Sequence, residues 1–140
     1  MAHKASRKPY RVGRSLSGLG LFATVPIENG AFIVEYKGRR ITHAEAKRRE
    51  ARGSRYIFEI NGRWSVDGSS RRNMARYANH SCRPNAESDL VKGKLILRAI
   101  RKIKPDDEIT YDYGEEYFRL FLEPVGCKCV KCREQRKARR

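Results

Sequence analysis

The residues from Asn79 to Asn85 form the least ordinary stretch of this 140-residue chain. An amide, an imidazole, a hydroxyl and a thiol stand side by side in Asn79-His-Ser-Cys82, and Pro84 ends the run. Short polar side chains compete for backbone hydrogen bonds, so this stretch is a poor interior for a helix or a strand. Taken alone, it predicts either a polar turn or part of a chemical site.

Two phenols and two glycines are equally ambiguous. Tyr111 and Tyr113 are spaced so that both side chains project from the same side of a strand. Such a pair is more often core or cross-strand packing than catalysis. Gly18 and Gly20 flank Leu19, a pattern found wherever a turn needs a positive φ. Neither feature identifies a function by itself.

The four cysteines predict a metal site. Cys127, Cys129 and Cys132 crowd together near the C-terminus, and Cys82 is the only other cysteine in the chain. Two disulfides would have to pair close neighbours in an awkward geometry. Four thiolates around one zinc ion fit the count better. The cysteines thus favour a reducing compartment, and we expect an intracellular protein of the cytoplasm or of the nucleoid or nucleus, with delivery into a host cell left open.

Charge is distributed unevenly along the chain. It carries 32 Lys+Arg against 16 Asp+Glu, a net charge of +16 at pH 7, which favours an anionic surface or partner. Residues 105–125 reverse the sign, with seven acidic side chains and one basic side chain. This acidic island predicts either a site for a cationic ligand or a solvated loop. The sequence contains no long apolar run, so neither a membrane span nor a secretory signal is expected.

The elements that must position these groups are short and mostly β. A chain of this length has room for one domain. A charged surface helix is expected over 43–52, because Thr42 and Glu45 have capping-box spacing and Gly53 can end the helix. One or two helical turns are expected over 115–122. Strands are predicted near 21–25, over 31–36 with Phe32, Ile33 and Val34 in the core, over 56–60 and 63–67 around Asn61-Gly62, over 90–91 and 95–99 around Lys92-Gly93, and over 108–113 after a turn at 105–107.

In their order along the chain, these features resemble the SET-domain family of protein lysine methyltransferases. The string Asn-His-Ser-Cys-x-Pro-Asn is highly specific to that family, and the cysteine cluster resembles the post-SET segment that follows the catalytic domain in many members. The resemblance runs from about Tyr10 to Cys132. Its landmarks are Gly18-Leu-Gly20, Glu35-Tyr36-Lys-Gly38, Arg76-Tyr77-Ala-Asn79-His-Ser-Cys82-Arg-Pro-Asn85 and Glu108-Ile-Thr-Tyr111-Asp-Tyr113.

The resemblance implies a fold and its division along the chain. The fold is the mostly β SET-domain (β-clip) fold with short helices, in which the chain near 79–85 and 111–113 forms a pseudoknot. A basic flexible arm over 1–9 would precede a SET domain over 10–122, and a post-SET-like zinc segment with a basic tail would follow over 123–140. S-adenosylmethionine would bind on one face, and the substrate lysine would enter from the other through a narrow channel.

The resemblance also implies roles for single residues. Tyr113 would take the central catalytic role, Tyr111 would influence how many methyl groups are added, and Tyr36 would line the channel. A bland alternative for Tyr36 and Tyr56 is packing, and for Arg76 it is a surface salt bridge. S-adenosylmethionine would be bound by Gly18, Leu19, Gly20, Tyr56, Arg76, Asn79 and His80.

The cysteines would hold one structural Zn2+ and tie the C-terminal segment to the pseudoknot. The expected ligands are Cys82, Cys127, Cys129 and Cys132. The two-residue gap before Cys132 is shorter than the commonest post-SET spacing, yet it suits zinc chelation. The aromatic residue that often closes over the cofactor has no clear counterpart after Cys132.

The sequence therefore predicts an S-adenosylmethionine-dependent protein lysine N-methyltransferase. Its expected substrates are basic proteins, histone-like or associated with nucleic acid, and it is expected to add one or two methyl groups. The basic arm and tail are expected to contact nucleic acid, and no membrane partner is expected. Two alternatives remain: a non-catalytic module with the SET fold, and a small basic zinc protein that binds nucleic acid. Affinity for S-adenosylmethionine would exclude the second of these.

Overall fold

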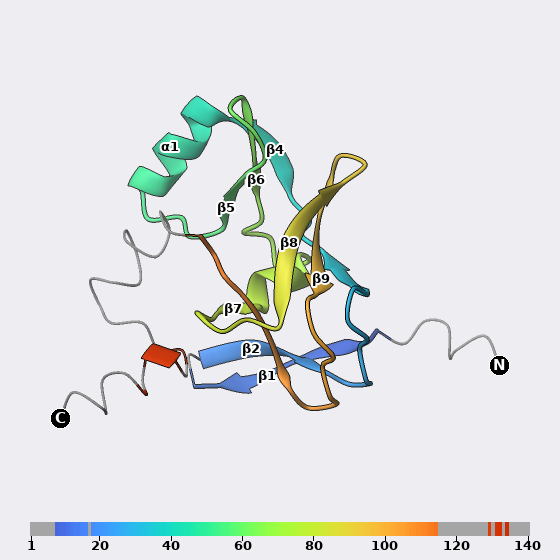
Figure 1. The fold of residues 1–140 in the computed structure, drawn as a ribbon. Coiled ribbons are helices and arrows are strands. Elements are labelled where there is room, and N and C mark those ends of the chain that lie inside the picture. Colours follow the sequence, from blue (N-terminus) through green and yellow to red (C-terminus); the bar gives the residue numbers. More distant parts are fainter. Residues whose placement is uncertain (1–7, 17, 115–128, 130, 133, 135–140) are drawn as a thin grey trace.

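The computed structural model describes residues 8–16, 18–114, 129, 131–132 and 134. It contains a sheet of seven strands and a smaller sheet of three, as the prediction of a mostly β domain requires (Figure 1). The larger sheet comprises β1 (Tyr10–Ser15), β2 (Gly18–Ala23), β10 (Glu108–Tyr111), β8 (Ala86–Val91), β9 (Lys94–Ala99) and β3 (Phe32–Glu35) in that order, with β7 (Asn79–His80) paired to β10.

The core lies on the inner faces of this larger sheet. Leu21 of β2, Leu97 of β9 and Ile109 of β10 are fully buried. Ile103, in the loop between β9 and β10, is also fully buried. Burying a side chain of this size contributes about 1.5–3 kcal/mol. β10, which pairs with the polar stretch at 79–80, is therefore fixed against an apolar layer.

β10 brings together segments that are distant in the sequence. It pairs antiparallel with β2 and parallel with both β7 and β8. In Figure 1 the orange segment that contains β10 runs across the middle of the molecule, past β7 and β8. The Asn85 side chain donates to the Glu108 carbonyl at 2.8 Å and accepts the Thr110 N–H at 2.9 Å. The segments 79–85 and 108–111 thus lie side by side, as the expected pseudoknot requires.

A second unit projects from the larger sheet between β3 and the 3-10 helix η2 (Met74–Tyr77). We call residues 37–72 the inserted subdomain. Its sheet has the order β4-β6-β5, and one helix packs against all three strands (Figure 1). Its elements are β4 (Arg39–Thr42), α1 (His43–Ala51), β5 (Ile57–Glu59) and β6 (Trp64–Asp67).

Local sequence explains how α1 is placed. The Thr42 side chain caps it by accepting the Glu45 N–H at 3.2 Å, which confirms the predicted helix start. Arg49 pairs with Glu45 at 2.9 Å and with Asp67 of β6, and Ala46 is buried beneath the helix. An ion pair and one small side chain therefore fasten α1 to its sheet.

Both predicted hairpins form, but their turns differ. Lys92 and Gly93 have φ values of 51° and 80°, as a type I′ turn requires. Asn61 and Gly62 adopt no positive φ. Instead, the Asn61 side chain accepts the N–H groups of Arg63 and Trp64 at 2.8 and 2.9 Å. This hairpin is closed by an asparagine side chain that replaces a backbone acceptor.

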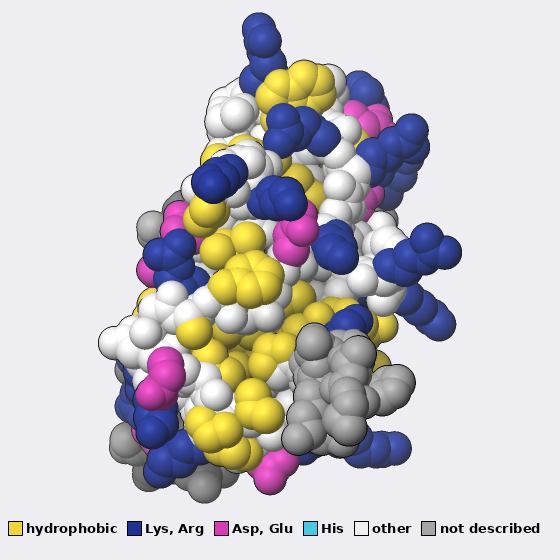
Figure 2. Space-filling model, turned by 90° about the vertical axis from the view of Figure 1, so that its right-hand side faces the viewer, with side chains coloured by type: hydrophobic (Ala, Val, Ile, Leu, Met, Phe, Trp, Pro, Cys, Tyr) yellow, Lys and Arg dark blue, Asp and Glu magenta, His cyan; other side chains and the backbone are white. Residues whose placement is uncertain are grey.

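One core prediction was wrong. Phe32 is 59% exposed, whereas Ile33 and Val34 are buried. The register of β3 against β9 shifts between Phe32 and Val34, so two consecutive residues face inward and Phe32 faces outward. Phe32 instead lines, with Ile96, an apolar groove of about 390 Å³. Figure 2 shows hydrophobic side chains gathered on that side of the molecule, with Lys and Arg around them.

Other differences concern the ends of elements. The sequence does not predict β1, β4 or β7, and β2 and β8 begin earlier than expected. Lys8 and Pro9, assigned to the flexible arm, both accept hydrogen bonds from Thr24 at 3.0 and 2.9 Å. The rest of the arm, the helical turns expected over 115–122 and most of the zinc segment lie outside the described residues. No helix in the described part of the chain is long and apolar enough to cross a membrane.

Candidate functional site

A small cavity of about 40 Å³ is lined by both the larger sheet and the inserted subdomain. All three tyrosines with predicted catalytic roles line it, together with Tyr56 and Arg76, for which cofactor binding was predicted. The structure therefore brings five of the predicted site residues to one place. The full lining consists of Tyr36, Arg55, Tyr56, Ile57, Phe58, Arg76, Tyr111 and Tyr113.

Residues 78–80, which include β7, hold Tyr113 at two points. The Tyr113 N–H donates to His80 Nδ1 at 3.0 Å, and the Tyr113 hydroxyl donates to the Ala78 carbonyl. Its ring lies 4.8 Å from that of Tyr111, which is buried at the end of β10. The parallel pairing of β7 with β10 is therefore what places the phenol at the cavity.

Tyr36 is held equally firmly. It is 5% exposed, and its hydroxyl donates to the Tyr56 carbonyl at 2.9 Å. A Cβ at Gly68 would lie 2.3 Å from the Tyr36 ring, so only glycine fits there. The buried Asn73 side chain holds the backbone on both sides of the Tyr36 ring. It donates to the Gly68 carbonyl at 3.0 Å and accepts the N–H of Lys37, the residue after Tyr36, at 2.9 Å. Sequence reasoning missed Asn73, which no recognisable pattern marks.

Arg76 stacks on aromatic rings. Its guanidinium carbon lies 4.3 Å from the Tyr56 ring centroid and 5.2 Å from that of Tyr77. Its Nε is buried without a hydrogen-bond partner, and no carboxylate among the described residues pairs with it. A buried donor without an acceptor is unfavourable by about 1–3 kcal/mol. The surface salt bridge considered for Arg76 is thus not what the structure shows, and the Nε remains available to an acceptor on a bound molecule.

A second cluster surrounds the Asn79 side chain. Its amide donates to the Leu19 carbonyl at 2.9 Å and to Glu108 Oε2 at 2.8 Å. The Ser15 hydroxyl lies 2.9 Å from both oxygens of the same carboxylate. A Cβ at Gly20 would lie 2.6 Å from Glu108 Oε2, so the glycine lets β2 approach this carboxylate closely. Glu108 therefore joins β1, β2 and β7, a role that sequence reasoning missed although Glu108 opens the landmark that contains Tyr111.

His80 connects the two clusters. It is 9% exposed, and burial lowers its pKa, although the nearby Asp112 carboxylate at 3.7 Å opposes the shift. A lowered pKa favours the neutral imidazole, and the hydrogen bond from the Tyr113 N–H requires an unprotonated Nδ1. His80 thus fixes the position of the phenol and carries no charge.

The residues present fit S-adenosylmethionine. Gly18 has a φ of 104°, is exposed and has open space where a Cβ would lie, so the main chain at the start of β2 is open to close approach, whereas the space at the buried Gly20 is filled by Glu108 and Asn79. The buried Arg76 Nε offers a hydrogen-bond donor, and Tyr56 offers an aromatic surface next to it. Main-chain groups, one donor and a ring suit the carboxylate and adenine of such a molecule.

The described cysteines converge as a metal site would require. The sulfur atoms of Cys82, Cys129 and Cys132 lie within 4.8 Å of one another, and those of Cys82 and Cys132 are 3.7 Å apart. Tetrahedral zinc with Zn–S bonds of about 2.3 Å separates its sulfurs by about 3.8 Å. Burial and the neighbouring thiols raise the pKa of Cys82. The three thiols therefore suit Zn2+; Cys127 lies outside the described residues.

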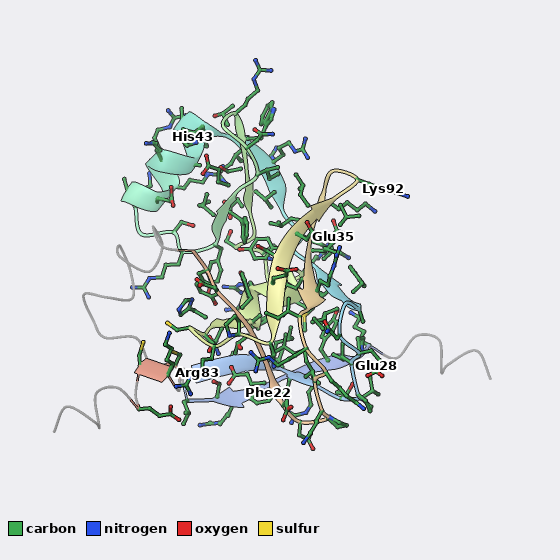
Figure 3. The ribbon with its side chains drawn as sticks, in the orientation of Figure 1. Phe22, Glu28, Glu35, His43, Arg83 and Lys92 are labelled. Atoms are coloured by element: carbon green, nitrogen blue, oxygen red, sulfur yellow. The ribbon has the colours of Figure 1, made fainter. Side chains whose placement is uncertain are left out.

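The cysteine cluster adjoins His80 and the segment that holds Tyr113. His80 Nε2 lies 3.3 Å from Cys82 Sγ, and Arg83, labelled in Figure 3, pairs with Glu134 at 2.8 Å. The C-terminal segment is thus attached directly beside the residue that positions Tyr113.

The described members of the acidic island have separate partners. Asp106 pairs with Arg11 at 3.3 Å, Glu108 faces neutral donors inside the sheet, and Asp112 lies near His80. Glu115, Glu116 and Glu123 lie outside the described residues, so the choice between a cationic-ligand site and a solvated loop stays a prediction.

The comparisons with known proteins agree with this geometry. The SET-domain family model matches residues 18–114, which include Gly18–Gly20, the Asn79–Asn85 stretch, Tyr111 and Tyr113. The chain belongs to the SET-domain family. It is 36% identical over 137 residues to an H3 lysine-4 specific histone-lysine N-methyltransferase of Emericella nidulans, an alignment that covers 90% of the chain and 11% of that relative.

Further relatives give the same picture. A protein of Candida albicans with the same description is 34% identical over 87% of this SET-domain chain and 14% of its own length. Among solved structures, a humanized mutant of the Chaetomium thermophilum Polycomb Repressive Complex 2 bound to the inhibitor GSK126 matches with a TM-score of 0.69 and 31% identity, over 83% of this chain and 16% of that one. The chain spans about a tenth of the length of the curated relatives it matches.

Proposed function

We propose that the chain is an S-adenosylmethionine-dependent protein lysine N-methyltransferase. One observation carries the proposal: Tyr36, Tyr111 and Tyr113 meet at a cavity beside Arg76, while Tyr113 is held by the same β7 segment that supplies Asn79. A shared segment for both clusters suits a reaction in which two bound molecules must be aligned. Membership of the SET-domain family supports this reading.

The reaction needs an uncharged amine. A free lysine has a pKa of about 10.4 and is mostly protonated at neutral pH. An aromatic cavity disfavours the ammonium, which lowers that pKa. S-adenosylmethionine would supply a methyl group on a positively charged sulfur, and this charge would lower the lysine pKa further. The cavity therefore favours the nucleophilic form of the substrate.

Positioning then contributes most of the rate enhancement. The Tyr113 hydroxyl gives its hydrogen to the Ala78 carbonyl, so its oxygen serves as an acceptor for the amine. Tyr36 and Tyr111 are buried and restrict the amine to one approach. Fixed dipoles of this kind lower the barrier without a covalent intermediate. Arg76, Tyr56 and the Gly18–Gly20 main chain would hold the methyl donor in line.

We propose that the substrates are basic, histone-like proteins and that the chain acts where such proteins package nucleic acid. The relatives described as acting on histone H3 lysine 4 support this substrate class. The four cysteines would hold one structural Zn2+, which would brace His80 and thus the cavity.

The number of methyl groups added would depend on Tyr111. A phenol at this buried position occupies space and offers a hydrogen bond, so a methylated amine has less room to turn. We expect mono- and dimethylation. Tyr111→Phe should shift the products towards higher methylation, as measured by mass spectrometry of the modified peptide; an unchanged distribution would contradict this role.

The test is transfer of labelled methyl from S-adenosylmethionine to a panel of basic proteins, with zinc-loaded protein. Label should appear on lysine. If the cofactor binds by calorimetry but no protein in a histone-containing panel is labelled, the alternative of a non-catalytic module with the SET fold is favoured. If the cofactor does not bind either, the proposed site is wrong.

A further inference from the structure

The outer side of α1 carries an unusual set of side chains. Its solvent-exposed residues are two alanines and three cations, with no exposed acid among them. Around the helix, the alanines lie in the middle of this face and the cations flank them, since successive residues are about 100° apart. The exposed residues are Ala44, Lys47, Arg48, Ala51 and Arg52.

The cationic face continues beyond both ends of the helix. The Arg63 carbonyl accepts the His43 N–H at 3.1 Å, which places the exposed Arg63 beside the start of α1. Arg55 follows the helix, is exposed and lines the cavity. A nine-residue helix is about 13 Å long, so the cations extend over more than that length. We define the basic strip as Lys47, Arg48, Arg52, Arg55 and Arg63.

The acids near the strip do not cancel it. Glu45 is partly buried at the edge of this face, where it joins Arg48 at 2.8 Å and Arg49 at 2.9 Å. Arg48 nevertheless keeps 60% of its side chain exposed. Glu50 is only partly exposed, and the exposed Glu59 lies near His43 at 3.8 Å. The carboxylates thus fasten α1, while the side chains of Arg48, Arg52 and Arg63 remain exposed.

We propose that the basic strip is a docking surface for the phosphate backbone of duplex DNA. Four of its five cations are arginines, which bind phosphate with two parallel hydrogen bonds. The alanines between them let a helix approach the backbone closely. The exposed residues of α1 include no aromatic side chain, so this helix lacks the stacking surface used for single strands. The proposal differs from the expectation that the basic arm and tail contact nucleic acid.

Position gives the strip a consequence for substrate choice. Arg55 belongs both to the strip and to the lining of the cavity. A duplex held along α1 would lie next to the entrance for a lysine. Basic proteins bound to the same duplex would then be concentrated at the site, without any specific contact to their sequence. Binding itself requires no methyl transfer, so it can be tested independently of the proposed activity.

The test compares three charge-matched triple variants of the full zinc-loaded chain by fluorescence anisotropy with a labelled 20-bp duplex. The strip variant is K47Q/R48Q/R52Q, the arm variant K4Q/R7Q/K8Q, and the loop variant K92Q/K102Q/K104Q. Figure 3 shows Lys92 on the side of the molecule away from His43 at the start of α1. A fourth variant, R48K/R52K, keeps the charge of the strip and serves as the folding control.

The strip variant should bind at least about 10-fold more weakly at 0.1 M salt, and its slope of log K against log salt should fall by about 2–3. The arm and loop variants should each lose less than about 3-fold, and R48K/R52K, which keeps the charge but loses the paired hydrogen bonds, should bind with an affinity between those of the native chain and the strip variant. Equal losses in all three triple variants, a loss confined to the arm variant, or no binding at 50 mM salt would overturn the proposal. So would an acidic peptide that binds the strip as tightly as the duplex.

Discussion

The centre of the larger sheet and the inserted subdomain use carboxylates in opposite ways. At the centre, the Glu108 carboxylate accepts hydrogen bonds only from the neutral groups of Ser15 and Asn79 among its described contacts. In the subdomain, Glu45 and Asp67 pair with arginines, and their guanidinium groups remain partly exposed. The first arrangement orients side chains for chemistry. The second holds a helix and leaves positive charge on the surface.

This difference predicts where a substitution affects function. Each partly buried hydrogen bond to a charged group contributes about 1.5–3 kcal/mol to stability and requires one geometry of the two groups. An exposed ion pair contributes about 0–1 kcal/mol to stability and can form in several geometries. Changes at the sheet centre should therefore alter cofactor affinity and turnover, and changes at the ion pairs that fasten α1 should alter stability alone.

The largest effect is expected at Cys82, which joins the cysteine cluster to the sheet centre. Cys82→Ser should reduce the zinc content and lower the free energy of unfolding by about 3 kcal/mol or more, because structural zinc contributes to folding. Methyl transfer should fall at least about 100-fold, since His80 loses its brace. Metal analysis measures the zinc content, and denaturant titration measures the free energy of unfolding. Chelation of the native chain should reproduce the loss and zinc should reverse it; full zinc content in the variant would contradict the ligand set.

A smaller loss is expected at Glu108. In Glu108→Gln one acceptor becomes a donor that faces Ser15 or Asn79, so the Kd for S-adenosylmethionine should rise about 10-fold. Calorimetry measures this directly. Glu87→Gln, an exposed carboxylate on β8, is the matched control and should change the Kd by less than about 2-fold. Equal effects of the two variants would show that general charge, and not the Asn79 contact, determines affinity.

The smallest effect is expected at Asp67. Burial alone would raise its pKa, but hydrogen bonds from Ser69 and Arg49 hold the pKa below its ordinary value. A lowered pKa stabilises the fold above the unfolded value of about 3.9, and this contribution disappears as the pH falls through the folded value. Asp67→Asn should lower the free energy of unfolding at pH 7 by about 1 kcal/mol, without changing cofactor affinity.

The pH dependence checks the sign of this effect. The difference in unfolding free energy between native and Asp67→Asn protein should begin to shrink below about pH 4, because the unfolded carboxyl then binds a proton, and it should disappear once the pH falls through the lowered pKa of the folded carboxyl. A difference that persists undiminished at pH 3 would show that the ion pair with Arg49 is not its source.

Sequence patterns predicted those parts of the fold that depend on neighbouring residues. The capped helix at Thr42 and the turn at Lys92-Gly93 are specified within four residues, so the chain reveals them. The outward position of Phe32 depends on a register shift against β9, which is invisible in β3 alone. β7 has only two residues and exists because β10 pairs with it, so no local pattern predicts it.

The same distinction applies to the site. The tyrosines, Arg76 and the Asn79 stretch were found because their order along the chain resembles a family. Glu108 and Asn73 were missed because their importance comes from partners far away in the sequence. Glu108 binds Asn79 and Ser15, which are 29 and 93 positions away, and Asn73 binds Lys37, which is 36 positions away. Their side chains differ from ordinary surface residues only in what the fold places around them. Long-range hydrogen bonds of this kind require coordinates.

The central claim is that β7 serves two clusters, Asn79 holding the methyl donor and Tyr113 directing transfer. The most direct test measures both binding of S-adenosylmethionine by calorimetry and methyl transfer for Asn79→Ala and Tyr113→Phe. We predict that Tyr113→Phe binds the cofactor with an affinity within about 3-fold of the native chain while transfer is lost. Asn79→Ala should lose affinity at least about 10-fold. Full transfer by Tyr113→Phe, or unchanged cofactor affinity in Asn79→Ala, would contradict the account.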